Sequence, residues 1–426
     1  MSHTHQVLDT LRFFSSQMWH SKLEELKSIL TRLPLSNHLY EDSSPTFSEQ
    51  LISFVRLEKY YHGLQFFCTR SIFSRRENLE SSYKSLQIWF GRIAGTSAER
   101  ENIMSKITMH LRNFCLIRAS LIDFYHSVDE NPISVITSCS EFSDSLIRLR
   151  NVLVTEDADN TRQAFEPIRV SIECELNVLV YLLRAQSYIA DLFFGDSLLC
   201  LKRASDDLSS LHSYLGFDNS LNVRPSGKAF SLLVWLNSFR NTVMAKYTLY
   251  WFNILMRSVS SPADVLTVAG TEDPNIVHLI SNFQRASGAL YIAIFFDTTC
   301  QEYPFLGHGY VLRGTVGEGP KGVESIPPIF TVPLGQSIPA ADVYAIVMQI
   351  SGVLNLGEPT EYDKLVYLFD EKLNHTYFIQ KLESRTFLSL VYEGCKSRRD
   401  KQIMSFVSSI ASLIRLQTLI SQLRSR

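Results

Sequence analysis

The segment from Thr298 to Ser325 holds the side chains best suited to chemistry. In its run FLGHGY, His308 stands between Gly307 and Gly309. A histidine in a glycine-rich segment could act as a general base, because imidazole changes its charge between about pH 5 and 8. A general base needs an acid or a nucleophile beside it, and none follows His308 in a recognised spacing. Catalysis is therefore the least favoured interpretation of this histidine.

The same segment carries a second glycine-rich run, GEGPKG, from Gly317 to Gly322. Its backbone N–H groups and Lys321 could cradle a phosphate, but the run lacks the spacing of a P-loop or a dinucleotide-binding loop. Connections of this length inside a compact domain more often serve a function than stay idle. We therefore predict that the segment binds a partner or docks a domain, with a purely structural loop as the alternative. The residues expected at this surface are Phe305, Gly307, His308, Gly309, Tyr310, Pro320, Lys321 and Gly322.

A second candidate surface is the basic run KSRRDK, from Lys396 to Lys401. The helical pattern beside it predicts that the run forms the first turn of a helix, with Ser397 and Asp400 in a capping-box-like start. Positive charge there opposes the helix dipole, so the charge does not serve helix stability. The run fits a solvated turn or a contact with an acidic partner or anionic lipid head groups. The residues expected in such a contact are Lys396, Arg398 and Arg399.

The elements that position both surfaces form an α+β pattern. Strand-like apolar runs cover Ala289 to Phe296, Ile326 to Leu334, Lys364 to Asp370, His375 to Lys381 and Thr386 to Glu393. Helical periodicity covers Asn275 to Ala286, Ala341 to Leu354 and the last apolar run, from about Ile403 to Ile414. Short polar turns join the last three strands and favour antiparallel hairpins. The order α-β-β-α-β-β-β-α resembles the roadblock and longin-type platforms, an analogy of fold that does not by itself give function.

Residues 1 to 270 read as one helix after another. The predicted helices cover Leu8 to Leu33, Phe47 to Arg70, a span beginning at Arg75, a long span ending near Val128, a span that includes Ile168 to Leu183, Asp196 to Leu215 and Phe230 to Val259. The last is the most apolar and is expected to be buried on more than one side. We predict a multi-domain α and β protein. An all-helical bundle domain covers 1–270, and a roadblock/longin-like α+β domain with an antiparallel five-stranded sheet covers 271–426, including the long glycine-rich loop at 298–325.

The composition of the 426 residues is that of a globular protein. A net charge of −2 argues against a nucleic-acid partner, because phosphate binding needs clustered lysine and arginine in excess. No run reaches the roughly 18 to 20 apolar residues of a transmembrane helix, and the first residues lack the pattern of a secretory signal. A soluble, intracellular protein is expected.

The seven cysteines are scattered and odd in number, which is unlike a disulfide framework or a zinc site. We expect them to be small core residues. His62 follows two tyrosines on an apolar helix and is expected to be a hydrogen-bonded core or boundary histidine rather than a ligand. No nucleophile elbow or paired-histidine motif occurs. The sequence therefore predicts no catalytic residue, no metal site and no cofactor.

Several runs resemble, in order and spacing, the KICSTOR complex subunit 2 family. They are KYYHGLQFF from Lys59, IFSRRENL from Ile72, FLGHGY from Phe305, PKGVESIP from Pro320, FDEKLNHTYF from Phe369 and KSRRD from Lys396. The resemblance covers about Ser48 to Leu413. Its most specific parts are the GHGY and PKGV runs in one loop and the hairpin that follows Asp370. The chain departs from the family at its first residues and in Gly216 to Lys228.

The resemblance implies a non-enzymatic scaffold subunit at the cytosolic face of the lysosomal membrane, held there peripherally through its complex. The implied partners are a kaptin-like protein, an FG-GAP-repeat protein and the large seizure-threshold protein. That complex brings the GATOR complex, which has GAP activity for Rag GTPases, to lysosomes and so restrains target-of-rapamycin complex one (TORC1) when amino acids or glucose are scarce. The alternatives are a roadblock/longin-like membrane-trafficking adaptor and, least favoured, an enzyme that uses the His308 segment.

Overall fold

The computed structural model describes residues 3–31, 46–67, 78–96, 103–132, 138–154, 160–215, 231–258, 275–299, 301–355, 362 and 364–424. Helices dominate the first part, and a sheet with its own helices follows. The first part contains α1 (His3–Gln17), α2 (Leu23–Leu30), α3 (Phe47–His62), η2 (Gln65–Phe67), α4 (Leu79–Thr96), α5 (Ile103–Glu130), α7 (Cys139–Val154), α8 (Asn160–Ala164), α9 (Glu166–Ala190), α10 (Phe194–Tyr214), α11 (Ser231–Tyr250) and α12 (Phe252–Ser258). The second contains α14 (Ile276–Ser287), β1 (Tyr291–Phe296), η4 (Gly322–Ser325), β2 (Pro328–Val332), α15 (Ala340–Asn355), β3 (Leu365–Asp370), β4 (His375–Lys381), β5 (Thr386–Glu393), α16 (Lys401–Ile414) and α17 (Gln417–Ser421).

The sheet is antiparallel throughout, with the strand order β2-β1-β5-β4-β3. β4 and β5 pair along a hairpin, from His375 opposite Glu393 to Lys381 opposite Phe387. The predicted five-stranded antiparallel sheet, in the order α-β-β-α-β-β-β-α, is confirmed. The predicted strands fit closely because apolar runs bounded by short polar turns leave little freedom in register.

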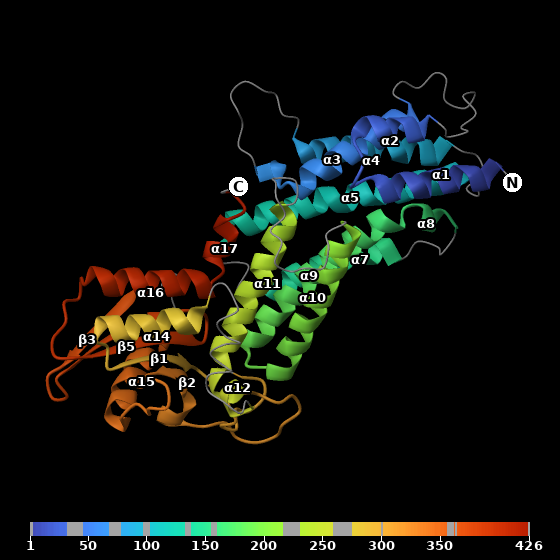
Figure 1. Ribbon diagram of the computed structural model, residues 1–426. Helices are drawn as coiled ribbons and strands as arrows, with labels where there is room; N and C mark the ends of the chain where they lie inside the picture. Colours follow the sequence, from blue (N-terminus) through green and yellow to red (C-terminus); the bar gives the residue numbers. More distant parts are fainter. Residues whose placement is uncertain are drawn as a thin grey trace.

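Different helices cover the two faces of the sheet, α14 and α16 on one and α15 on the other (Figure 1). Ile292 in β1 belongs to the same core cluster as Val407 of α16. Its neighbour Ala293 belongs to a second cluster, which contains Ile350 of α15. Successive side chains of a strand point to opposite faces, so the central strands are apolar on both.

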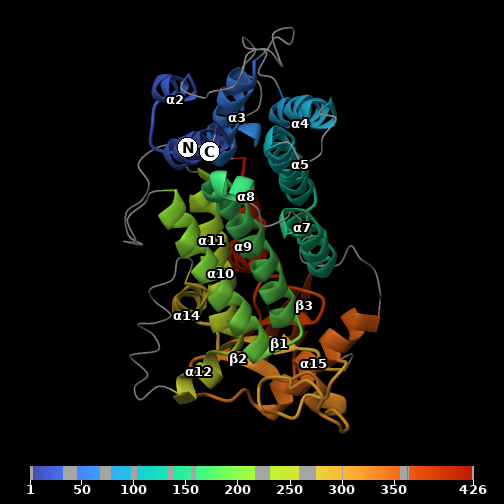
Figure 2. The ribbon, with the colours of Figure 1, turned by 90° about the vertical axis from the view of Figure 1, so that its right-hand side faces the viewer.

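The helices α9, α10 and α11 run side by side, with α1 to α4 across one end and the sheet near the other end (Figures 1 and 2). α11 is buried along most of its length, as predicted. The single helix predicted to continue to Val259 is wrong, since α11 ends at Tyr250 and α12 starts at Phe252. Between them lies Trp251, which is fully buried. After this break Phe252 packs edge-on against Phe330 of β2, with ring centroids 5.6 Å apart.

Two other predicted helix ends are also wrong. The span predicted as one helix from Leu8 to Leu33 contains both α1 and α2. α3 ends at His62 because Gly63 is a poor helix former and Leu64 takes a left-handed conformation, with φ 53°. α7 has no counterpart among the predicted helices, since serines and charged residues interrupt its apolar positions.

Several predicted features lie outside the described residues. They are the helix start at Arg75, the segment from Gly216 to Lys228 and the domain boundary near residue 270. The division into two domains therefore stays a prediction. Among the described cysteines, core placement is confirmed for Cys115, Cys139, Cys174 and Cys200. It is wrong for Cys395, which is exposed.

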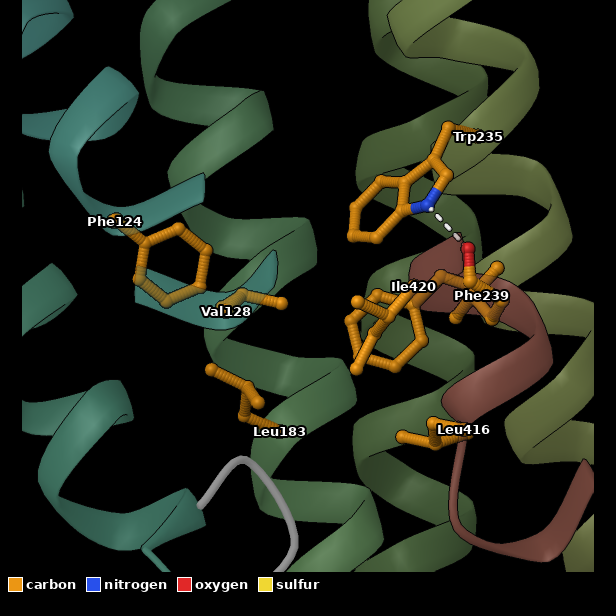
Figure 3. A pocket seen from close by; sticks show the side chains of 8 residues that line it. Phe124, Val128, Leu183, Trp235, Phe239, Leu416 and Ile420 are labelled. Carbon is orange, nitrogen blue, oxygen red and sulfur yellow. Dashed lines mark hydrogen bonds between the residues drawn. The ribbon is translucent and has the colours of Figure 1, made fainter. Parts of the chain in front are cut away.

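One hydrophobic cluster extends from Val7 to Leu423 and includes one face of the sheet. α17 joins it beside α5, α9 and α11, where the indole N–H of Trp235 donates to the carbonyl of Leu419 at 3.1 Å (Figure 3). A cavity of about 10 Å³ remains there, lined by Phe124, Val128, Leu183, Trp235, Phe239, Leu416, Leu419 and Ile420. A space of this size holds about one water molecule, so it is a packing gap and too small for a cofactor.

Candidate assembly surfaces and buried polar clusters

The segment over 298–325 is attached to the corner between α9 and α10. The backbone N–H of Val311 donates to the carbonyl of Leu192 at 2.9 Å, and the amide of Gln301 donates to the carbonyl of Asp191 at 3.2 Å. Leu192 has φ 57°, a left-handed conformation that is costly for a leucine. The corner thus offers backbone carbonyls that the segment uses as acceptors.

Arg313 adds a charged attachment at the same corner. Its guanidinium lies 3.3 Å from the carboxylate of Asp196. It also lies 4.8 Å from the ring centre of Phe193 and 5.0 Å from that of Tyr188. Both charged side chains remain about half exposed, so screening by solvent keeps the contribution of this pair small.

The expected surface residues of the segment divide into an inner and an outer set. Phe305 is buried, and the ring of Tyr310 lies 6.0 Å from that of Phe194. Gly309 has φ 86°, and a Cβ at this position would lie 3.0 Å from Cδ1 of Ile254. Phe305, Gly309 and Tyr310 form the inner set, which helps attach the segment to the helices.

The outer set consists of Gly307, His308, Lys321 and Gly322, all of which are exposed, with Pro320 half-buried beside them. The ring of His308 lies 6.2 Å from that of Tyr310. The ammonium of Lys321 lies 2.5 Å from the carboxylate of Glu318, which competes with any phosphate for that charge. Within the described residues no group of three or more histidine, cysteine or acidic side chains could hold a metal ion.

Except for Lys401, the first residue of α16, the basic run lies before this helix rather than inside it. Asp400 is the N-cap, and its carboxylate accepts hydrogen bonds from the N–H groups of Gln402 and Ile403 at 2.9 and 3.2 Å. The prediction that the run forms the first helical turn is therefore wrong. Because Arg398 and Arg399 stand ahead of the N-cap, the conflict with the helix dipole is weaker than expected.

Lys396 anchors this basic run to the sheet. Its backbone N–H donates to the hydroxyl of Thr376 at 3.0 Å, and its carbonyl accepts from the hydroxyl of Tyr367 at 2.9 Å. Its ammonium lies 5.3 Å from the ring centre of Tyr392. Arg398 and Arg399 are exposed, so a fixed base presents two guanidinium groups to solvent.

A buried carboxylate, Glu383 in the β4–β5 turn, links the sheet to the helices. The ammonium of Lys246 forms an ion pair with it. The hydroxyl of Tyr250 donates to it at 2.7 Å and the amide of Gln186 at 2.9 Å. Burial lowers the pKa of Lys246, and the charge of Glu383 opposes that effect. Burial also raises the pKa of Tyr250, with a further contribution from Glu383.

Two arginines reinforce this junction. The buried guanidinium of Arg415, next to α16, donates to the carbonyls of Leu382 and Lys381 at 2.8 and 2.6 Å. Arg385 lies 3.4 Å from the carboxylate of Asp191 at the end of α9. The β4–β5 turn is therefore held from both sides, by the helical part and by the chain that follows α16.

A second buried cluster lies where α3, α4, α5 and α9 meet. Its members are Glu58, Tyr61, Tyr83, Arg118, Tyr125 and Glu175. Arg118 makes a two-pronged contact with Glu58, in which Nε and Nη2 lie 2.9 and 2.8 Å from the two carboxylate oxygens, and it also pairs with Glu175. The hydroxyl of Tyr83 donates to Glu58 at 2.8 Å, and those of Tyr61 and Tyr125 donate to Glu175 at 2.6 and 2.8 Å.

Burial and neighbouring charge act in opposite directions on the pKa of Arg118. Burial is the largest influence on this pKa and lowers it, but the charges of Glu58 and Glu175 together raise that pKa well above its ordinary value. Burial lowers the pKa of the adjacent His62 well below 6.5, and the charge of Arg118 lowers it further. His62 is 1% exposed, so its predicted core position is confirmed. No substrate could reach these buried groups, which makes the cluster structural.

Neither of these two clusters was predicted from the sequence. Arg118, Glu175 and Lys246 each stand within an apolar helical run. Charged side chains on an apolar helix face are rarely left unpaired, so this signal could have marked all three. Their partners lie 50 to 137 positions away in the chain, and no local pattern connects such pairs.

The part of the chain that the structure describes contains no helix long and apolar enough to cross a membrane. The family model described as KICSTOR complex C12orf66 like matches residues 45–425. The chain is 26% identical over 379 residues to KICSTOR subunit 2 of Danio rerio, covering 84% of this chain and 82% of that protein. It is 25% identical over 386 residues to KICSTOR subunit 2 of Xenopus laevis, covering 84% and 83%. Both candidate surfaces lie within the matched residues.

Proposed function

The chain belongs to the family described as KICSTOR complex C12orf66 like, and from this premise we propose that it is a non-enzymatic scaffold subunit of a KICSTOR-like complex. The resemblance predicted from the sequence runs is confirmed. In the proposed role the complex recruits the GATOR complex to lysosomes and restrains TORC1 when amino acids or glucose are scarce. The observation that carries the proposal is the family match along most of the chain.

Two properties of the residues support a scaffold rather than an enzyme. His308, the strongest candidate for catalysis in the sequence, is exposed, and its ring lies tilted at 6.2 Å from that of Tyr310. Two described groups of ionisable side chains, one around Arg118 and one around Glu383, are buried, and the members of each group pair with one another. A catalytic group must instead reach a substrate.

We further propose that the sheet and its helices are a roadblock/longin-like module. The order α14-β1-β2-α15-β3-β4-β5-α16 supports it, together with helices on both faces of the sheet. In this proposal the outer residues of the 298–325 segment and the basic run beginning at Lys396 face partner subunits. Contact through such surfaces would give peripheral association with the lysosomal membrane.

Affinity purification of the tagged full-length chain from cells of its source, followed by mass spectrometry, tests the proposal. We expect a kaptin-like protein, an FG-GAP-repeat protein and the large seizure-threshold protein to be recovered together. Loss of the chain should also leave TORC1 active after amino acids are withdrawn. Recovery of trafficking-coat subunits without any of these three proteins would instead favour a membrane-trafficking adaptor and overturn the proposal.

A further inference from the structure

The two edge strands of the sheet, β2 and β3, differ in how far other elements cover them. At the β2 edge, the amide of Asn253 donates to the carbonyl of Ile329 at 3.0 Å, and Phe252 packs on Phe330. The strand also begins with Pro328, and its pairing with β1 is irregular. Proline, irregular pairing and cover by other elements are the usual ways to protect an edge strand from further pairing. The β2 edge is therefore closed.

The β3 edge has none of these protections among the described residues. No described strand lies beyond β3 in the sheet, and β3 sits at the outer margin of the sheet, away from the helical part (Figure 1). Leu365 to Phe369 reads LVYLF, without charge or proline, and every residue of the strand is half-buried. Its pairing with β4 is regular. An apolar, regular edge of this kind is suited to pair with another strand.

Val366 and Leu368 of β3 pack into the same cluster as α15, the helix that covers this face of the sheet. Asp342 is the only charged residue of α15, and it is buried, with its carboxylate bonded to His375 and Tyr377 at 2.7 and 2.6 Å. The solvent-facing side instead carries Tyr344 and Met348, which are 57% and 52% exposed. A helix face that stays in water normally carries charged residues, so this face fits a contact with protein.

We propose that β3 pairs with β3 of a second copy of this chain, antiparallel and around a two-fold axis that passes beside Tyr367. In this register the strand is complementary to itself. Leu365 lies opposite Phe369 of the second copy, Val366 opposite Leu368, and Lys364 opposite Asp370. Opposite charges that face each other across an antiparallel pair stabilise it. The two sheets join into one continuous sheet, and the two copies of α15 lie on the same face.

The charged residues at the two ends of β3 favour a second copy of this chain, rather than an unrelated strand, as the partner of this edge. Lys364 is exposed. One carboxylate oxygen of Asp370 accepts hydrogen bonds from the backbone N–H groups of Lys372 and Leu373 in the following turn, at 2.8 and 3.2 Å. The other oxygen is left to face Lys364 of the second copy. Lys364 and Asp370 lie at equal distances from Tyr367, the centre of the strand. Lys364 of one copy can therefore face Asp370 of the other only when β3 pairs with β3. The contact uses the same patch twice, as two-fold symmetry requires.

Analytical ultracentrifugation of the full-length chain tests this self-pairing. At concentrations up to roughly 100 µM, we expect a species of twice the 48.7 kDa of one chain. Lys364→Glu replaces both attractions with repulsions and should raise the dissociation constant about tenfold. Adding Asp370→Asn removes the repulsion, keeps the acceptor for the turn and should recover part of the loss.

Lys372→Glu, an exposed change in the turn after β3, is the matched control and should leave the dissociation constant unchanged. All three variants should keep the wild-type melting temperature, because the altered side chains are outside the core. A chain that stays monomeric at every concentration overturns the proposal. So does a dimer that Lys364→Glu does not weaken, and so does pairing of this edge only with a different protein. Self-pairing is independent of which complex the chain joins.

Discussion

Arg118 and its two carboxylates carry charge where all three side chains are fully buried. The hydroxyls of Tyr61, Tyr83 and Tyr125 donate hydrogen bonds to Glu58 and Glu175. A buried ion pair adds little net stability over an apolar core, but removing one partner is costly because the other charge is left unpaired. Loss of any one of Glu58, Arg118 or Glu175 is therefore expected to be destabilising, because it leaves a buried partner uncompensated.

His62, at the margin of this cluster, should make the protein sensitive to acid. The folded chain holds it neutral because its pKa is well below 6.5, whereas the unfolded chain binds a proton below about pH 6.5. Stability is therefore lost as the pH falls through that value, by about 1.4 kcal/mol between pH 7.5 and 5.5. In urea unfolding at both pH values, His62→Gln should remove this part of the difference. His308→Gln, an exposed change, should keep it, and equal pH sensitivity in all three proteins would contradict the prediction.

At the scale of elements, the strands follow from the sequence more closely than the helices do. Both ends of β4 and of β5 lie at the residues predicted from the strand-like runs and the short turns between them. The helix before Gly63 was predicted too long, and the break at Trp251 was missed, since an apolar helical pattern does not show where neighbouring elements force a turn. The Val311 and Arg313 contacts of the 298–325 segment were missed for the same reason, because their partners lie more than a hundred residues earlier.

Trp251 should contribute strongly to the junction of α11 and α12. It is fully buried, and its ring lies 5.4 Å from that of Phe194 and 4.6 Å from that of Tyr247. Trp251→Ala should lower the free energy of unfolding by about 3 to 5 kcal/mol, because the cavity adds to the lost burial. Trp251→Phe should lose less than half of that amount, since the indole N–H has no hydrogen-bond partner among the described residues. A loss below about 1 kcal/mol in urea denaturation for the alanine variant would contradict the burial.

The basic run before α16 should serve assembly rather than folding. The triple variant Lys396→Ser, Arg398→Ser and Arg399→Ser should keep the melting temperature within about two degrees. Arg398 and Arg399 are exposed, and exposed substitutions change stability by less than about 0.5 kcal/mol. Lys396 is half-buried, but its hydrogen bonds to Thr376 and Tyr367 use the backbone, which serine keeps. It should nevertheless reduce recovery of partner subunits by co-precipitation. Wild-type recovery should fall as salt rises, because exposed charges are screened beyond about 8 Å at physiological ionic strength.

The matched control for this variant is Lys22→Ser with Lys27→Ser in the region of α2, which lies before the residues matched by the family. It removes exposed positive charge elsewhere and should leave recovery unchanged. Normal recovery of partners with the triple variant would show that the basic run is only a solvated turn.

Over the whole molecule, the helical part and the sheet share one core cluster and are joined through Glu383. The sequence patterns distinguish the helical part from the α+β part, but they do not indicate that the two parts pack together. The contacts at Glu383 join residues 133 to 197 positions apart. Sequence patterns are local, so they predict the elements and not this junction.

Glu383→Ala should destabilise both parts together. It leaves the buried ammonium of Lys246 without its carboxylate, which should cost about 3 to 5 kcal/mol. Hydrogen exchange with increasing urea should show amides of α11 and β5 losing protection in the same step, earlier than in the wild type. Glu393→Ala, an exposed change at the end of β5, should alter stability by less than about 0.5 kcal/mol. Loss of protection in β5 alone would show that the two parts unfold independently.

The position of α17 constrains how the chain folds as it leaves the ribosome. α5, α9 and α11 are translated first, but the space beside Trp235 is filled by Leu416, Leu419 and Ile420, which are translated after the whole sheet. Until they emerge, the nascent helices expose an apolar slot, and contacts between such distant residues form slowly. Exposed apolar surface on a growing chain is what chaperones bind and what drives aggregation. A premature stop codon shortly before Leu416 would therefore leave every strand intact and still yield a protein prone to clearance.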